Sequence, residues 1–290
     1  MKKRMIFIFI LFLLLFINGC SIWDINFNFT TSPQTTLSTT LPTIQDGTMT
    51  IVNGQYDSYA QYLSPSYSLT DVNEYNEILI ATRDKIRKSN VQVVATIYHY
   101  SSFFPYSSVV DSTMSGSGVI FNADETYYYV ITNEHVINNK GKLADYHITL
   151  FGSTNEKKAT LLVYDEDLDL AVLKVPKGTE DNIEIMDIST RVFHKYNTGE
   201  MVLAVGNPLS VVNNVTFGEF LGMMTISNAS YRVIYHNAMI HEGSSGGALT
   251  DVDGHFLGIN TWGSQDSDEE SFAIPSDIVY MFLYNHGFFE

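Results

Sequence analysis

The sequence Gly243-Ser244-Ser245-Gly246-Gly247-Ala248-Leu249 places a serine inside a glycine-rich turn, directly before an apolar run. Such a turn can point backbone N–H groups at one place, which suits the binding of an oxyanion. A serine hydroxyl is a poor nucleophile until a base removes its proton, so the turn indicates catalysis only if a histidine and a carboxylate accompany it. Taken alone, the stretch is also typical of an ordinary flexible turn.

Both missing groups stand upstream of the turn. His135 lies in TNEHVI (132–137), after an apolar run, and Asp169 lies in DLDLAVLKV (167–175). We prefer Asp169 to Asp167 because it directly precedes a strand that should be buried, where a carboxylate is shielded and held against an imidazole. The alternative interpretation of His135 is a hydrogen-bonded histidine at a strand end, and that of Asp169 is a residue in a solvated acidic loop. The chain order His, Asp, Ser is the order of the chymotrypsin barrels, and it differs from that of subtilisins and α/β-hydrolases.

Six short motifs follow one another in an order that is far more specific than any one of them. They are TNEHVI, DLDLAVLKV, GNP at 206–208, GSSGGAL, LGINT at 257–261 and FAIP at 272–275. From about Val91 to about Phe288 the chain therefore resembles the protease domain of the HtrA/DegP serine proteases. Many members carry PDZ domains after the protease, whereas this sequence ends at Glu290 after a short tail, so we expect regulation through loops, oligomerisation or substrate supply.

The resemblance implies a role for each candidate residue. Ser245 is the nucleophile because the family pattern places it directly before the Gly-Gly pair, His135 is the general base, and Asp169 orients the imidazole. The implied oxyanion site consists of Gly243, Ser244 and Ser245, with the backbone N–H groups of Gly243 and Ser245 as the donors. The implied substrate-binding residues are Ile240, Gly258, Ile259, Asn260 and Thr261. The expected reaction is cleavage of unfolded or flexible proteins at apolar residues, without a cofactor.

Short runs rich in β-branched and aromatic residues predict an all-β fold. We expect two six-stranded antiparallel β-barrels of the trypsin-like fold within a protease domain at 91–290, a short helix from Ser276, and the active site in the cleft between the barrels. The first barrel, about 91–180, should use 91–100, 118–121, 127–132, 147–151, 159–164 and 170–175. The second, about 188–275, should use 201–205, 215–224, 232–239, 248–250, 255–261 and 271–274.

The first 19 residues are typical of a signal peptide. Three basic residues precede an apolar run at 5–17, which is too short for a comfortable membrane span. The run ends in Ile17-Asn18-Gly19-Cys20, which resembles a bacterial lipobox with cleavage before Cys20 and acylation of that residue. An ordinary secretory peptide or an uncleaved anchor is the alternative. Cys20 is the only cysteine, so no disulfide can form within one chain.

Between the leader and the protease domain we expect a tether at 20–48, rich in Ser, Thr and Pro, and an extension at 49–90. A helix within 70–86 should pack on the first barrel, although it could mediate self-association, and the resemblance implies a homotrimer. The formal net charge of −16 disfavours nucleic acid and anionic lipid, so membrane attachment should come from the lipid. The eight histidines lack ligand spacing, and we expect no metal site.

Two other functions stay open. One is a catalytically silent surface-binding lipoprotein that retains the barrels, and the other is a secreted protease similar to glutamyl endopeptidases. An intact triad and glycine loop argue against the first. The lack of an evident basic or hydroxyl-rich wall beside Ser245 argues against the second. Digestion of unfolded casein would distinguish an enzyme from a binding protein.

Overall fold

A computed structural model describes residues 44–45, 48–49, 72–100, 108–138, 142–179, 181–192, 196–208, 213–227, 229–263 and 270–289. All of them belong to one compact unit, 36–290. The leader and Cys20 lie outside the described residues. At the end of the expected tether, β1 (Ile44–Gln45) pairs with β2 (Thr48–Met49). No helix among the described residues is long and apolar enough to cross a membrane.

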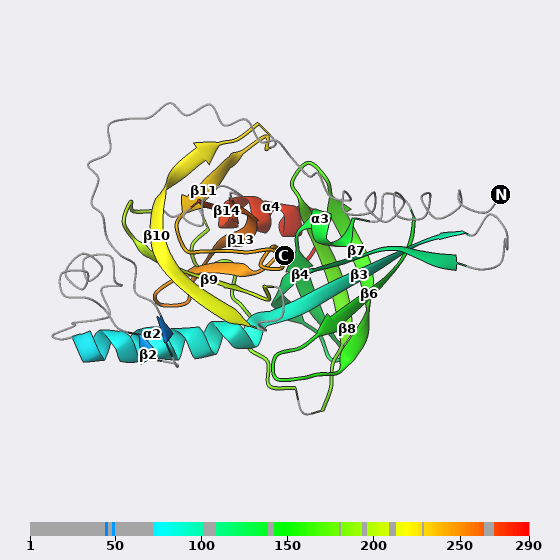
Figure 1. The fold of residues 1–290 in the computed structure, drawn as a ribbon, viewed down its shortest axis with the longest axis horizontal. Coiled ribbons are helices and arrows are strands. Elements are labelled where there is room, and N and C mark those ends of the chain that lie inside the picture. The colour runs from blue at the N-terminus through cyan, green and yellow to red at the C-terminus, as the bar shows by residue number, and fades with distance from the viewer. Residues whose placement is uncertain are drawn as a thin grey trace, which may run out of the picture. The chain divides into compact units, whose positions relative to one another are not determined.

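The first half of the protease region forms a closed antiparallel barrel, drawn in teal and green in Figure 1, with the strand order β3-β4-β5-β8-β7-β6. Its strands are β3 (Asn90–Tyr100), β4 (Ser108–Ala123), β5 (Tyr127–Thr132), β6 (Leu143–Thr149), β7 (Glu156–Asp165) and β8 (Leu170–Pro176). All six predicted strands are present. The structure extends β4 well before the predicted start at 118, because Ser108 to Ser115 pair with β3 along an exposed arm.

The second half closes into another antiparallel barrel, drawn in yellow and orange, with the order β10-β11-β14-β13-β12-β9. Its strands are β9 (Met201–Gly206), β10 (Asn214–Thr225), β11 (Arg232–His236), β12 (Ala248–Asp251), β13 (Phe256–Gly263) and β14 (Ser271–Pro275). Two six-stranded barrels confirm the predicted fold class. The predicted strand 232–239 ends earlier, at His236.

Three clusters of buried apolar side chains stabilise the two barrels. The interior of the first barrel contains Val93, Val130 and Leu173, and the interior of the second contains Ile234, Leu249 and Ala273. A third cluster, the inter-barrel core, joins outward-facing residues of both barrels.

Strand β8 shows how a sequence without alternating polarity fits this arrangement. Leu170 and Val172 face the inter-barrel core, while Ala171, Leu173 and Val175 face the first-barrel interior. The residue just before β8 therefore lies at the junction of the two barrels.

Two longer helices complete the domain. Helix α4 (Ser276–Asn285) starts at the predicted residue and places Val279, Phe282 and Leu283 in the inter-barrel core. Helix α2 (Val72–Ile86) also forms as predicted, and short elements α3 (Glu134–Ile137) and η1 (Arg87–Ser89) accompany them.

Helix α2 was expected to pack on the first barrel, but it packs on the inter-barrel core, which contains residues of both barrels. Leu79 and Ile86 enter the inter-barrel core, and the Thr82 hydroxyl donates to the Val252 carbonyl in the β12–β13 turn at 2.6 Å. A Cβ at Gly254 would lie in contact with Thr82 and Ile86. The helix is therefore fixed to the second barrel by both apolar and polar contacts.

Candidate active site

His135 and Asp169 meet at the edge of the first barrel, next to the second. His135 lies in α3, just after β5, and Asp169 lies in the turn before β8. The Asp169 carboxylate accepts the backbone N–H of His135 at 3.0 Å and is 2.9 Å from the His135 Nδ1 atom. The Asn133 amide donates to the Asp169 backbone carbonyl at 3.0 Å. Asp169 adopts a φ of 54°, and these bonds hold that conformation.

The second barrel supplies a further donor to the same carboxylate. The Thr261 hydroxyl of β13 donates to Asp169 Oδ2 at 2.7 Å. The Tyr231 hydroxyl donates to the carbonyl of Leu168, the residue before Asp169, at 2.9 Å. Burial raises the pKa of Tyr231, and Asp169 and Asp165 raise it further, so it stays a neutral donor. The sequence motifs did not assign a role to either hydroxyl.

Ser245 lies in the turn between β11 and β12. The Ser244 N–H donates to the His241 carbonyl at 2.8 Å, which closes a four-residue turn, and Gly243 has a φ of 95° at its third position. A type II turn needs this positive φ, and a Cβ at Gly243 would collide with the Asn207 carbonyl.

The turn leaves two N–H groups for an oxyanion. Within the part of the chain that the structure describes, the N–H groups of Gly243 and Ser245 donate to no other residue. These are the two donors expected at the oxyanion site, and Ser244, the third residue named there, contributes no donor because its N–H is used inside the turn.

Ser117 of the first barrel fixes this turn from the opposite side. Its N–H donates to the Ser245 carbonyl and its hydroxyl donates to the Gly243 carbonyl, both at 2.7 Å. The Ser117 Oγ atom also accepts the Asn207 N–H at 2.8 Å. Asn207 is the asparagine of the GNP motif, and its side chain donates to the Val91 carbonyl at 2.8 Å. Sequence patterns gave no signal for Ser117, because a serine in a Ser/Gly-rich stretch has no distinguishing context.

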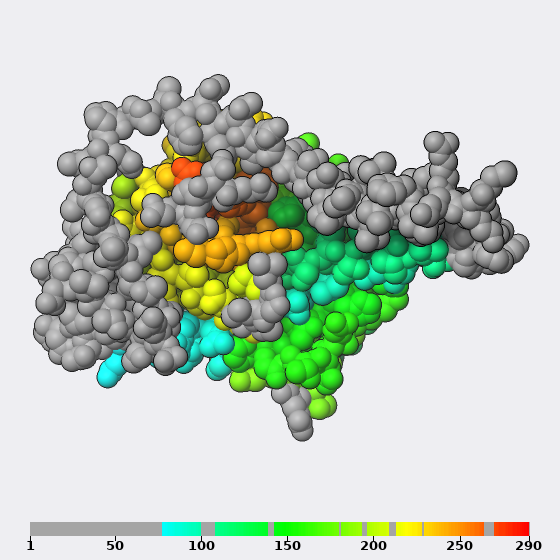
Figure 2. Space-filling model, viewed as in Figure 1, coloured from blue at the N-terminus to red at the C-terminus, as the bar shows by residue number. Residues whose placement is uncertain are grey.

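The Ser245 hydroxyl donates to the Thr261 carbonyl at 2.9 Å. Thr261 links this hydroxyl to the His135–Asp169 pair, because its carbonyl accepts from Ser245 and its own hydroxyl donates to Asp169. In Figure 2 the orange atoms of the region that holds β12 and β13 lie at the surface beside teal atoms of the first barrel.

The expected pairing of substrate with Gly258, Ile259 and Asn260 is contradicted. Gly258 and Ile259 already pair with β12 on one side and β14 on the other. Asn260 exchanges backbone hydrogen bonds with Gly246 and Gly247, and its own register partner in β14 is Ala273. A strand with neighbours at both edges has no N–H or C=O groups left for a peptide.

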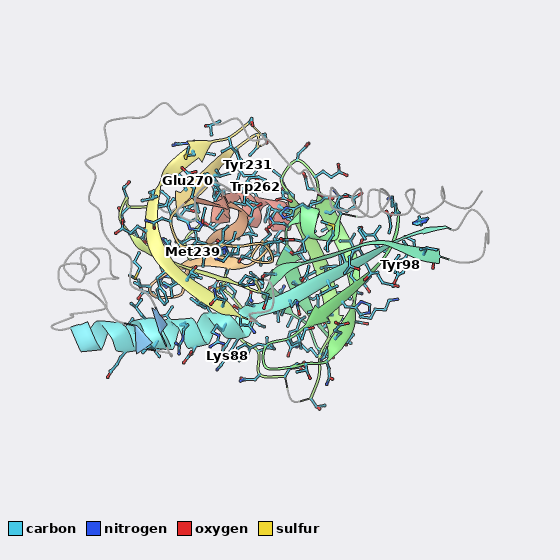
Figure 3. All side chains as sticks on the ribbon, viewed as in Figure 1. Lys88, Tyr98, Tyr231, Met239, Trp262 and Glu270 are labelled. Carbon is cyan, nitrogen blue, oxygen red and sulfur yellow. The ribbon has the colours of Figure 1, made fainter. Side chains whose placement is uncertain are left out.

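The exposed edge of β13 begins only at Thr261. Trp262 and Gly263 pair with β14 alone, because β12 starts at Ala248 and the chain before it turns away as the serine loop. Trp262 is labelled on the second barrel in Figure 3, as is Met239, which precedes Ile240. Ile240 is partly buried and packs against the second-barrel interior. Substrate binding by Thr261 and Ile240 therefore stays a prediction.

Burial alone would lower the pKa of His135, but the Asp169 carboxylate outweighs it, and the pKa is raised above its usual value of about 6.5. The nearby Glu134 carboxylate raises the pKa of His135 further. The His135 side chain is 37% exposed, so solvent reaches one side of the ring. With its proton on Nδ1 facing Asp169, the ring can accept a proton at Nε2.

The raised pKa of His135 predicts how peptidase activity depends on pH. Hydrolysis needs neutral His135, so kcat/KM should rise with pH through a midpoint above 6.5. The charged pair stabilises the fold below pH 6.5, and this contribution is lost as the pH rises through the higher folded-state pKa. The same midpoint should appear in an NMR titration of His135 in the inactive Ser245→Ala variant. A midpoint below 6.5 in both measurements would contradict the assignment.

One further group of acidic and histidine side chains lies in the β12–β13 turn. Among the described residues, Asp251, Asp253 and His255 offer ligand-type atoms within 4.8 Å of one another. The Asp251 carboxylate already binds Arg191 at 2.8 Å and His255 Nδ1 at 3.1 Å, and it accepts the N–H groups of Asp253 and His255. We assign this group a structural role in closing the turn.

Comparison with known proteins agrees with this geometry. Residues 116–259 match the family model described as a trypsin-like peptidase domain. The chain therefore carries a peptidase domain of the trypsin class.

Individual relatives indicate which kind of trypsin-class peptidase this domain resembles. The serine protease Do-like HtrA of Bacillus subtilis is 34% identical over 202 residues, which cover 66% of this chain and 43% of that protein. The serine endoprotease DegS of Haemophilus influenzae is 32% identical over 216 residues, or 69% of this chain and 59% of that protein. The structure of the HtrA-type protease AlgW with a tripeptide has a TM-score of 0.58 and 28% identity, covering 72% of this chain and 64% of its own.

The domain is that of an HtrA-like serine protease with the trypsin fold, as the resemblance of its motifs implied. The chain spans between 34% and 59% of the length of the curated relatives it matches.

Proposed function

We propose that this protein is an extracytoplasmic serine endopeptidase that cleaves unfolded or flexible proteins through an acyl-enzyme. The observation that carries the proposal is the Asp169–His135 pair, joined through Thr261 to Ser245 in a turn with two available N–H groups. Peptide substrates fit a protease of this family. The roles below are those that the geometry supports best.

In the first half of the reaction the Ser245 hydroxyl turns from the Thr261 carbonyl to His135 Nε2 and gives up its proton as Oγ attacks the peptide carbonyl. The N–H groups of Gly243 and Ser245 bind the oxyanion of the tetrahedral intermediate. Asp169 holds the Nδ1–H tautomer and stabilises the imidazolium. The carbon–nitrogen bond then breaks, and His135 passes the proton to the leaving amine.

In the second half, water gives a proton to His135 and attacks the acyl-enzyme, which restores Ser245 and releases the carboxylate product. The exposed edge from Thr261 to Gly263 favours a substrate in extended conformation, because added-strand pairing needs unpaired backbone groups on both partners. Folded proteins hide those groups. This argues for unfolded or flexible segments as the substrate.

The direct test is digestion of unfolded casein beside a stably folded protein of similar size. We expect cleavage of casein alone, labelling of the enzyme by a fluorophosphonate at Ser245, and no effect of EDTA. Loss of activity with EDTA that returns on addition of a divalent metal would contradict this mechanism. Intact casein together with an unlabelled serine would favour a binding protein. The homotrimer implied by the family resemblance belongs to the same proposal and is checked by light scattering.

We also propose that the protein is a bacterial lipoprotein held to the cell membrane through Cys20. The support is the sequence alone, an apolar core at 5–17 that ends in Ile-Asn-Gly-Cys. A diacylglycerol adds two acyl chains, and two chains anchor stably where one binds reversibly.

The anchor makes a further prediction. The mature protein should partition into detergent with a blocked N-terminus at Cys20, and Cys20→Ser should leave a precursor that still carries its leader. Mass spectrometry of the N-terminal peptide distinguishes the two forms. A mature N-terminus well downstream of Cys20, in protein recovered from the medium, would identify a secreted enzyme instead.

A further inference from the structure

Two buried polar side chains face each other across the β11–β14 ladder, and among the described residues no hydrogen bond of ordinary geometry satisfies them, although the backbone of Ala238 lies close to the His236 ring. His236 pairs in register with Ser271. His236 is fully buried and Ser271 is 1% exposed. Neither ring nitrogen of His236 and no atom of the Ser271 hydroxyl makes a hydrogen bond with the described residues. Buried polar groups in proteins nearly always have a partner, so this pair calls for an explanation.

The pair closes the β11–β14 ladder at the last residue of β11, from which the chain continues into the segment that carries Ser245. Ile234 and Ala273 form the neighbouring rung of the same ladder, and both belong to the second-barrel interior. Side chains two residues apart on a strand share a face, so His236 and Ser271 point to the same interior side.

A continuous line of residues connects this pair to the exposed edge of β13. Ser271 also pairs in register with Gly263, the last residue of that edge. A Cβ at Gly263 would lie 3.4 Å from the Ile240 side chain, five residues before Ser245. Figure 3 labels Trp262 and Glu270, the neighbours of Gly263 and Ser271, on the second barrel. Ile240, Gly263, Ser271 and His236 are therefore successive neighbours between the serine loop and the second-barrel interior.

The chemistry of the pair is polar without charge. Burial lowers the pKa of His236 to about 3, and the backbone of Ala238 offsets this only in part. His236 is therefore a neutral imidazole at physiological pH, with one N–H donor and one acceptor nitrogen. The Ser271 hydroxyl adds a second donor and acceptor.

We propose that His236 and Ser271 bind the side chain of the substrate residue whose carbonyl is attacked, and that this side chain is uncharged and ends in a hydroxyl or an amide. The inference rests on the proposed peptidase function. Ile240 contacts the apolar stem of that side chain, and the polar pair contacts its end. This replaces the expectation, implied by the family resemblance, of cleavage at purely apolar residues.

Other side chains suit the position less well. An apolar side chain would leave the already buried imidazole and hydroxyl without a hydrogen-bond partner, whereas a polar one would satisfy them. A carboxylate or an ammonium would enter a barrel interior whose cluster residues are all uncharged, and a buried charge needs a charged partner. Threonine and glutamine are therefore better suited than valine, methionine or glutamate.

The test uses peptide substrates that differ at one residue. The matched pairs are Thr against Val and Gln against Met, which test the polar end at constant size, and Gln against Glu, which tests charge. Full-length enzyme should show a kcat/KM at least about 10-fold higher for the polar member of one of the first two pairs. The kcat/KM for the glutamine peptide should exceed that for the glutamate peptide. His236→Leu should remove or reverse the preference for the polar member.

Ser271→Ala is the second variant, because it removes one hydroxyl and keeps the neutral imidazole even if His236→Leu fails to fold. It should reduce the preferred ratio several-fold. The inference is overturned if the apolar member is preferred in both pairs, if glutamate exceeds glutamine, or if a folded variant keeps the wild-type ratios. Fluorophosphonate labelling of Ser245 distinguishes a failure of the peptidase function from a failure of the proposed specificity. Unlabelled wild-type enzyme contradicts the peptidase function itself, whereas labelled enzyme with unchanged ratios contradicts only the specificity.

Discussion

Ser245→Ala should reduce proteolysis by roughly four to six powers of ten while the fold stays intact, because the members of a triad act as a unit. The side chain of Ser245 makes one hydrogen bond, to the Thr261 carbonyl, so its removal disturbs little else. The backbone bond from Ser117 to the Ser245 carbonyl is kept. The measurement is the kcat of casein or peptide hydrolysis, beside circular dichroism and the melting temperature.

Ser244→Ala is the matched control in the same turn. Its hydroxyl accepts the His241 N–H at 3.2 Å and has no place in the reaction, so the variant should keep activity within about 10-fold. Comparable hydrolysis by Ser245→Ala in a preparation free of contaminating protease would remove Ser245 from the mechanism.

Asp169→Asn should lower kcat by roughly 10⁴-fold near neutral pH. An asparagine amide nitrogen cannot accept a hydrogen bond, so the variant loses one of the acceptor atoms that serve His135 and Thr261. The imidazole then takes the wrong tautomer for proton transfer at Nε2. Asparagine tolerates the left-handed backbone conformation at this position, which makes the substitution a test of chemistry and not of folding.

Asp167→Asn provides the control for the carboxylate. Asp167 is exposed and stands two residues before Asp169 in the same turn, so its loss should change kcat by less than about 2-fold. A severe effect at Asp167 with a mild one at Asp169 would show that the wrong carboxylate had been assigned. Both variants are compared at a pH above the midpoint for His135.

The barrels could be predicted from the sequence because most of their strands have a local signal. Runs such as 170–173 and 201–205 are apolar throughout, since each is buried on both faces of its strand. The first half of β4 was missed for the opposite reason. Its residues 108–113 are exposed and largely polar, and only pairing with β3 makes them a strand.

The errors in the candidate site concern hydrogen bonds that no motif records, most of them between segments that are distant in the sequence. The sequence indicates that 257–261 is a strand, but not that β12 and β14 occupy both edges as far as Asn260. Likewise, a motif cannot show that the Ser244 N–H closes its own turn. The helix at 72–86 has a recognisable pattern, yet its partner depends on the hydroxyl of Thr82 reaching Val252, 170 residues away. His236 was part of a predicted strand, and only its burial reveals that its ring lacks a partner.

The contact between Ser117 and the serine loop also affects when the protein can become reactive. Ser117 belongs to the barrel made first during synthesis, whereas Gly243 and Ser245 come from the barrel made last. A chain whose halves have not yet docked has neither the bonds that shape the loop nor a base beside the hydroxyl. A molecule that has not finished folding therefore lacks a working nucleophile, and peptidase activity arises only once both barrels have docked.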